Sequence, residues 1–267
     1  MILPAAVLLA LLPDAHAADG YGSVSGQVVF DGPKLTLKQL VAPDDKKVRD
    51  KCCTVKGVPN SDLLIDEKSK GISNVFIYIR DYDGDIHPDL KESKKKEISF
   101  DQKNCKFLPH SLLIRTDQKV LLKSDDNCTH NTNATSFFNN EQFNVVIQPK
   151  TREGLPVKFE GAESLPAKIE CNIHPFMRAY WLILDHPYAA KTDKDGKFKI
   201  DKLPAGTYDF VVWHPKTLYL RTGYEAGKAG KSRRGFKVEI KADGDTNIGK
   251  VTVDRKALRE LSDEEVE

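Results

Sequence analysis

The 267-residue sequence has little net charge, few long apolar runs and none of the common catalytic motifs. Its 41 Lys and Arg against 39 Asp and Glu leave a formal charge of +2, so the strongly basic balance typical of nucleic-acid-binding proteins is missing. A nucleophile triad, a paired acid–base signature and a Gly-rich phosphate loop are also absent from the sequence. These absences exclude the best-known hydrolase and nucleotide-binding classes. We therefore expect a protein that is not an enzyme and does not bind nucleic acid.

The longest apolar run lies at the N-terminus, between Ile2 and Leu12. It is about half as long as a membrane-spanning helix, which needs about 20 residues. The small-x-small triplet Ala15-His16-Ala17 follows it. These features predict an export signal over residues 1–17, although the usual basic residues before the apolar run are missing. We expect an exported protein, periplasmic or extracellular, without a membrane span.

The five cysteines are an odd number. An exported protein can form disulfides, and an odd count leaves at least one thiol free. Cys171 is the expected free thiol, because His174 and Met177 follow it closely. Four cysteines remain for two bridges: Cys52, Cys53, Cys105 and Cys128. Neighbouring cysteines bond only with strain, so each of the first two is expected to reach one of the last two, in either combination.

Short segments of alternating or continuous apolar residues, separated by turn residues, predominate. In residues 22–32, Val24, Val28 and Phe30 alternate with polar residues before an Asp-Gly turn. Further strands are predicted within 74–85, 111–127, 143–149, 180–187, 197–215, 236–240 and 247–253. Residues 37–70 are polar with weak periodicity and predict a long loop held by Cys52 or Cys53. The predicted fold class is all-β, a sandwich or barrel.

A thiol, an imidazole and a thioether occur within seven residues, as Cys171-x₂-His174-x₂-Met177. This soft-to-borderline set suits copper, and two histidines with a cysteine and a weak axial methionine form blue-copper sites. The second histidine is predicted to be His130, just after a predicted strand at 120–124. Zinc is the main competitor, but tetrahedral zinc sites seldom use methionine.

Two segments resemble the ligand motifs of cupredoxins. CNIHPFMRAYWLIL (171–184) resembles the copper loop of the amicyanin and plastocyanin branch, and KVLLKSDDNCTHN (119–131) resembles the upstream ligand segment. The resemblance covers residues 98–187 and implies a Greek-key β-sandwich or barrel. It implies one copper ion with four ligands: His130, Cys171, His174 and Met177.

The same resemblance implies roles around the ion. Asn131 would tie the two ligand segments together with its side-chain amide. Pro175 and Phe176 would line an apolar patch at the imidazole edge of His174, where a redox protein docks. Cys128 departs from the family pattern; if it is bridged it braces the ligand loop, and if it is free it competes for metal.

The flanking sequence resembles a second family. TDKDGKFKIDKLPAGTYDF (192–210) and GSVSGQVVFDGP (22–33) resemble carboxypeptidase-regulatory-like domains of transthyretin type, which implies a scaffold or attachment role. A calcium loop is not expected at Asp193, because Pro204 stands where an EF-hand needs Glu. The cupredoxin part is thus predicted to be inserted in, or packed against, a second small β-sandwich. The predicted organisation is a signal peptide (1–17), the first part of this sandwich with its long loop (18–97), a copper domain (98–187), the second part of the sandwich (188–254) and a polar tail (255–267).

The predicted function is that of a one-electron carrier with one copper ion that cycles between Cu(I) and Cu(II). Two alternatives stay open at this point: a copper-binding or copper-delivery protein without a redox partner, and a structural or carbohydrate-adhesion module. The histidines His110, His186 and His214 are expected to be turn or partly buried residues rather than ligands.

Overall fold

The computed structural model describes residues 20–259. The predicted signal peptide and residues 260–267 of the predicted tail lie outside the described residues. The regular secondary structure is almost entirely β-strand, which confirms the predicted all-β class. No helix in the described part is long and apolar enough to cross a membrane. The short helical elements are α1 (Lys51–Thr54), η1 (Pro88–Leu90) and η2 (Arg255–Ala257).

Two sheets contain strands from both ends of the chain. In the three-stranded sheet, the first strand lies between a late antiparallel partner and the last strand, which runs parallel to it. This sheet has the order β13 (Lys197–Pro204), β1 (Tyr21–Asp31), β18 (Asp245–Asp254). The second sheet has the order β12 (Ala189–Lys191), β2 (Phe76–Ile79), β14 (Gly206–His214), β17 (Gly235–Ile240), β16 (Gly230–Lys231), with β15 (Leu218–Tyr219) also paired to β14.

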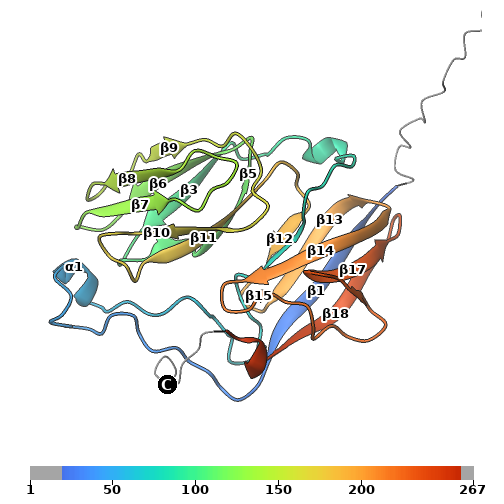
Figure 1. Cartoon of the computed structure of the whole chain (residues 1–267), viewed down its shortest axis with the longest axis horizontal. Helices are drawn as coiled ribbons and strands as arrows, with labels where there is room; N and C mark the ends of the chain where they lie inside the picture. The colour runs from blue at the N-terminus through green and yellow to red at the C-terminus, as the bar shows by residue number, and fades with distance from the viewer. Residues whose placement is uncertain (1–19, 260–267) are drawn as a thin grey trace, which may run out of the picture.

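Two further sheets are built from the middle of the chain. One has the order β5 (Ser111–Arg115), β11 (Arg178–Leu184), β10 (Ala167–Glu170), β7 (His130–Ala134), β8 (Phe143–Ile147). The other has the order β4 (Phe107–Leu108), β3 (Glu97–Gln102), β6 (Lys119–Ser124), β9 (Leu155–Val157). The predicted strands in 111–127 are thus β5 and β6, which follow each other in sequence but belong to different sheets. Figure 1 shows these sheets in green and yellow beside the unit that holds β1 and β18.

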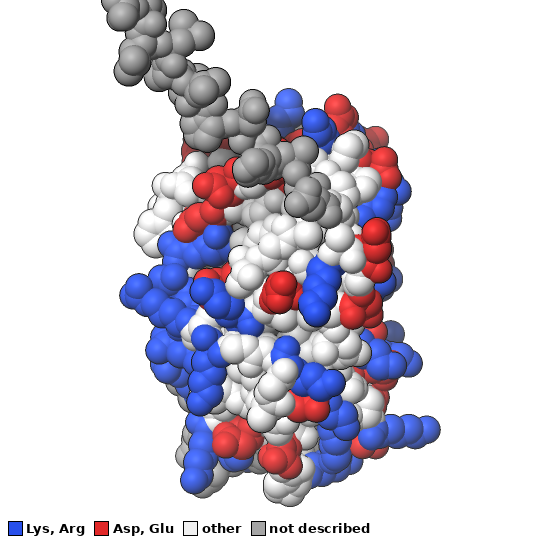
Figure 2. Space-filling view, turned by 90° about the vertical axis from the view of Figure 1, so that its right-hand side faces the viewer, with Lys and Arg blue, Asp and Glu red and all other residues white. Residues whose placement is uncertain are grey.

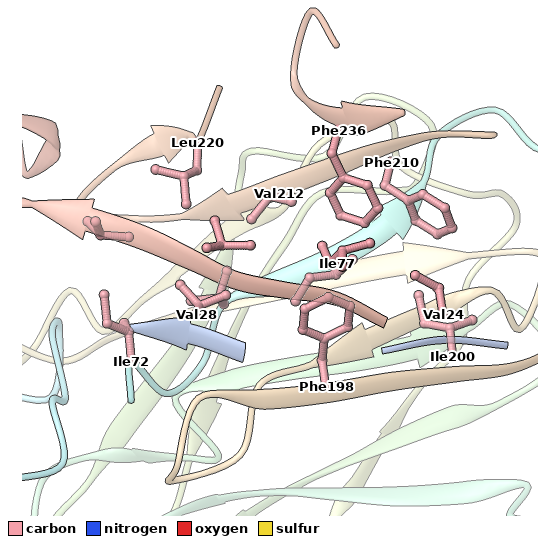
Figure 3. Packing of buried hydrophobic residues seen from close by; sticks show 14 of the residues in the cluster. Val24, Val28, Ile72, Ile77, Phe198, Ile200, Phe210, Val212, Leu220 and Phe236 are labelled. Atoms are coloured by element: carbon pink, nitrogen blue, oxygen red, sulfur yellow. The ribbon is translucent and has the colours of Figure 1, made fainter. Parts of the chain in front are cut away.

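The core between the first two sheets is formed by side chains far apart in sequence. Val24 and Val28 of β1 are buried with Phe198 and Ile200 of β13. Figure 3 shows these residues opposite apolar side chains of the six-stranded sheet, among them Phe210. Burying such side chains is the main favourable term in folding, about 1.5–3 kcal/mol each. This packing joins the N-terminal strand to the C-terminal third of the chain.

A separate apolar cluster joins the two units. It contains side chains of β2, β11 and β14: Phe76, Tyr78, Leu182, Leu184, Val211 and Trp213. All four residues of β2 are buried, and so are the last four of β11. Strands covered on both faces read as continuous apolar runs, which explains FIYI at 76–79 and WLIL at 181–184. These strands fix the two units against each other.

Charge is unevenly distributed over the surface although the total is close to neutral. Figure 2 shows both signs on one face and a gathering of Lys and Arg along one flank of it. In sequence, the residues 221–237 hold six basic residues and one acidic residue, Glu225. The near-neutral total therefore includes a locally basic segment, residues 221–237.

The core of the middle unit is centred on Trp181. Its side chain is fully buried, and its ring centroid lies 4.9 Å from that of Phe100 and 6.0 Å from that of Phe159. The same cluster contains Cys171 and Met177. The predicted ligands therefore rest on an aromatic core rather than on a loop exposed to water.

We predict that Trp181→Ala lowers the free energy of unfolding by about 3–5 kcal/mol, the cost typical of a large core truncation. Urea unfolding followed by circular dichroism measures this loss. Phe138→Ala is the matched control, because Phe138 is an aromatic residue with 82% of its surface exposed. Equal effects of the two substitutions would contradict the assignment of Trp181 to the core.

Candidate metal centre

Strand pairing brings two ligand segments together. His130 is the first residue of β7, and Cys171 directly follows β10. β10 pairs with β7 on one side and with β11 on the other, so that Glu170 lies opposite both Asn133 and Arg178. This pairing places the start of the loop from Cys171 to Met177 beside the beginning of β7. Within the loop, the Met177 amide donates to the His174 carbonyl at 2.8 Å and forms a tight turn.

The ligand atoms of His130, Cys171 and His174 all lie within 4.8 Å of one another. The Nδ1 atoms of the two imidazoles are 3.0 Å apart, and the Cys171 Sγ is 3.8 Å from Nδ1 of His174. The three residues are 0%, 1% and 3% exposed, in chain order. Met177 is 2% exposed and belongs to the same apolar cluster as Cys171. The predicted histidine and cysteine ligands thus converge, and the predicted axial residue is buried in the cluster that contains Cys171.

Asn131 connects the two ligand segments through its side-chain amide. Its Oδ1 accepts hydrogen bonds from the backbone N–H groups of Asn172 and Ile173 at 2.7 and 3.2 Å. Its Nδ2 donates to Oδ1 of Asn144 and to Oδ1 of Asn172. The Asn131 backbone N–H points at the Cys171 sulfur at 3.5 Å. This one residue holds the start of the ligand loop to β7 and β8.

The surroundings of the Cys171 sulfur favour its anion. Burial raises the pKa of this thiol, but hydrogen bonds from His130, from His174 and from backbone N–H groups outweigh burial and lower the pKa to about 6. For His130, burial lowers the pKa, because it disfavours the charged imidazolium. Hydrogen bonds to Asp126 and Cys171 outweigh burial and raise the pKa to about 9. A thiolate, the form that binds metals, is therefore present at neutral pH.

Each predicted histidine ligand also contacts a carboxylate through its outer nitrogen. Nε2 of His130 lies 2.9 Å from Oδ2 of Asp126, and Nε2 of His174 lies 2.7 Å from Oδ2 of Asp50. The Nε2 atoms are therefore occupied, which leaves Nδ1 of each ring as the atom that faces the sulfur. Metal-binding histidines usually make this kind of outer hydrogen bond. Sequence reasoning missed both carboxylates.

This donor set fits a single soft-to-borderline cation. The two Nδ1 atoms lie 3.0 Å apart, a distance that requires either a proton or a cation between them. A thiolate, two imidazoles and a nearby thioether are the set that copper prefers. A structural zinc site would more often use several cysteines, and the other four cysteines of this chain are bonded in pairs.

The disulfides are Cys52–Cys128 and Cys53–Cys105. The prediction that Cys171 is the free thiol is confirmed. Cys128 is therefore bridged and unavailable as a thiolate ligand, although its sulfur lies 3.6 Å from Nε2 of His130. Each of Cys52 and Cys53 is bonded to one of the other two cysteines, as the sequence predicted, and both bridges hold the long loop.

His174 is buried, whereas the sequence predicted that its imidazole edge lies in an apolar patch formed by Pro175 and Phe176. The docking of a redox protein at this patch stays a prediction. Pro175 is exposed and Phe176 is partly buried, with its ring centroid 5.7 Å from that of His174. His174 itself is 3% exposed, and the Asp50 carboxylate covers its outer nitrogen. The sequence did not reveal this cover because Asp50 comes from the long loop, 124 residues away in the chain.

The three remaining histidine candidates lie apart from this cluster. His186 and His214 are buried and accept hydrogen bonds from nearby backbone N–H groups through Nδ1. His110 is buried near Asp62, with Nε2 and Oδ1 3.9 Å apart. They are more buried than predicted. Among the described residues, none of the three belongs to a cluster of three or more side chains that could hold a metal ion together.

Comparisons with known proteins show a partial likeness in structure to cupredoxins. No family model matches the sequence, and no curated protein matches it. A Cu-containing nitrite reductase (NirK) from Thermus scotoductus SA-01 is 16% identical over 33% of this chain and 22% of its own, with a TM-score of 0.29. Amicyanin from Paracoccus versutus is 15% identical over 40% of this chain and 96% of its own (TM-score 0.27). A purple cupredoxin from Nitrosopumilus maritimus is 21% identical over 29% of this chain and 80% of its own (TM-score 0.24).

We predict that Cys171 of the metal-free protein is ionised at pH 7 and protonates as the pH falls through about 6. Because this pKa is depressed below its ordinary value of 9.0, the contribution of the thiolate to stability is complete above about 9. It is lost as the pH falls through about 6. The ultraviolet absorbance of the thiolate follows the titration, and Cys171→Ser must abolish it. A titration step near pH 9 would contradict the ionised centre.

Proposed function

We propose that the protein is an exported one-electron carrier with one mononuclear copper ion. His130 and His174 would bind the ion through Nδ1, Cys171 through its thiolate, and Met177 as a weak axial ligand. When bound, copper supplies a one-electron couple between Cu(II) and Cu(I). The observation that carries the proposal is the convergence of two imidazole nitrogens and the Cys171 sulfur within 4.8 Å in a buried site.

The surroundings of the ligands support a carrier. The loop from Cys171 to Met177 is fixed by its own backbone hydrogen bonds, by Asn131 and by the aromatic core around Trp181. Ligands held in this way change little when the charge of the site changes, which favours rapid electron transfer. This role needs no substrate-binding site, and we propose a carrier rather than an enzyme.

Export is part of the proposal. Two disulfides suit an oxidising compartment such as the periplasm or the outside of a cell. A redox protein would be the partner. The sandwich around β1 and β18 would be the scaffold or attachment module implied by its resemblance to carboxypeptidase-regulatory-like domains.

Copper delivery is the less favoured alternative. A delivery protein must release its ion to an acceptor, which requires access to the ligands. Here the three converging ligands are at most 3% exposed, and a segment bound by two disulfides provides the cover over His174. These features favour retention of the ion.

Addition of Cu(II) to the metal-free protein is expected to produce intense visible absorption from thiolate-to-copper charge transfer, saturating at one equivalent. Absorption titration and metal analysis measure the binding. Cys171→Ser removes the sulfur and must abolish the band. Weak absorption of the kind given by nitrogen and oxygen ligands alone would refute the thiolate–copper centre, and a structural or adhesion module would then be favoured.

We expect Met177→Gln to lower the reduction potential while copper remains bound, because an amide oxygen stabilises Cu(II) more than a thioether does. Protein-film voltammetry and metal analysis of the variant test both parts. Complete loss of copper from this variant would show that Met177 is more than a weak axial ligand.

A further inference from the structure

The cover over the candidate metal centre is a defined structure, residues 37–63, which we call the strap. In Figure 1 the chain runs from the end of β1 to α1 beside the middle unit and then returns toward the unit that holds β1. The two arms of the strap are joined by hydrogen bonds between the backbones of Val41 and Val58 and from Asp44 to Thr54. Val41, Val58 and Cys53 are buried in the same cluster as Cys171 and Met177. The strap is therefore packed onto the core beneath the ligands.

The two disulfides attach the strap beside one ligand. Cys52 is bonded to Cys128, which lies two residues before His130. Cys53 is bonded to Cys105, whose backbone N–H donates to the Asp126 carboxylate at 2.8 Å. The tip of the strap is thereby fixed close to His130 and its carboxylate partner.

Asp50 stands two residues before Cys52, at the N-cap of α1. Aspartate at this position usually accepts a hydrogen bond from the first turn of the helix. Asp50 makes no such side-chain bond. Its carboxylate instead lies on Nε2 of His174 at 2.7 Å, and its side chain remains 45% exposed. The Asp50 carboxylate therefore contacts His174, 124 positions away in the chain, rather than a backbone N–H of its own helix.

The contact repeats the arrangement at the other histidine. Asp126 lies on Nε2 of His130, Asp50 lies on Nε2 of His174, and both Nδ1 atoms point inward. In a neutral imidazole, a carboxylate on one nitrogen holds the proton there and leaves the other nitrogen as the lone-pair donor. Asp126 is close to its histidine in sequence, whereas Asp50 reaches the site only because the strap is fixed over it.

We propose that Asp50 is a positioning residue for the metal centre. It holds His174 in the tautomer protonated at Nε2, directs Nδ1 toward Cys171 and closes the outer edge of the ring to water. The effect on metal affinity rests on the proposed copper function. The effect on the His174 ring does not, because it belongs to the metal-free protein as well.

Substitution of Asp50 tests the proposal in two measurements. The ring nitrogen chemical shifts of His174, from ¹⁵N NMR of the metal-free protein, report its tautomer. The affinity for Cu(I) is measured in competition with a chromophoric chelator. In Asp50→Ala we expect the Nε2-protonated form of His174 to lose its dominance, and the Cu(I) affinity to fall by about 10- to 100-fold.

Two variants make the result specific. Asp50→Asn keeps an acceptor oxygen without the charge, and we expect it to restore the tautomer and most of the affinity. Asp44→Asn removes the same charge from the same strap at an exposed residue with a φ of 58°, a conformation that asparagine tolerates. We expect this control to match the wild type in both measurements and in its urea midpoint.

The proposal is overturned if Asp50→Ala leaves the His174 ring shifts and the Cu(I) affinity equal to those of Asp44→Asn. It is also overturned if Asp50→Asn behaves like Asp50→Ala in its ring shifts, since a hydrogen-bond acceptor would then not be what positions the ring. If the wild type binds no copper, the copper function fails, and the ring shifts of the metal-free variants still decide the role of Asp50.

Discussion

The pairing of β10 with both β7 and β11 is the constraint on which the centre depends. It places the end of β10, where Cys171 begins the ligand loop, beside the start of β7, where His130 stands. The buried aromatic cluster around Trp181 packs against these strands and fixes their positions. The strand pairing thus fixes where Cys171 and His130 meet. The loop then adds the side chains of His174 and Met177.

Electrostatics explain why such a polar group is tolerated in a core. A buried thiolate or imidazolium is costly unless it is paired and hydrogen-bonded. Here the thiolate receives backbone N–H groups and lies against two imidazoles, and each imidazole has a carboxylate behind it. Asp50 and Asp126 thereby link the buried centre to the surface. The disulfides hold these carboxylate-bearing segments in place.

Local patterns made much of this arrangement predictable. The Cys-x₂-His-x₂-Met spacing sets up a compact loop, and the odd cysteine count correctly left Cys171 free. The alternation and apolar runs gave the all-β class. The sequence could not reveal Asp50, because strap and loop share no spacing or periodicity, and its position depends on tertiary packing. For the same reason His174 was expected at the surface, and the disulfide partners were left open.

The central claim is that His130, Cys171 and His174 bind one copper ion together. Copper K-edge X-ray absorption of the protein loaded with one equivalent of copper tests it most directly. The account predicts one short sulfur scatterer and two imidazole nitrogens, nearly unchanged between the oxidised and reduced protein. A shell of nitrogen and oxygen alone, or one with several short sulfur scatterers, would contradict it.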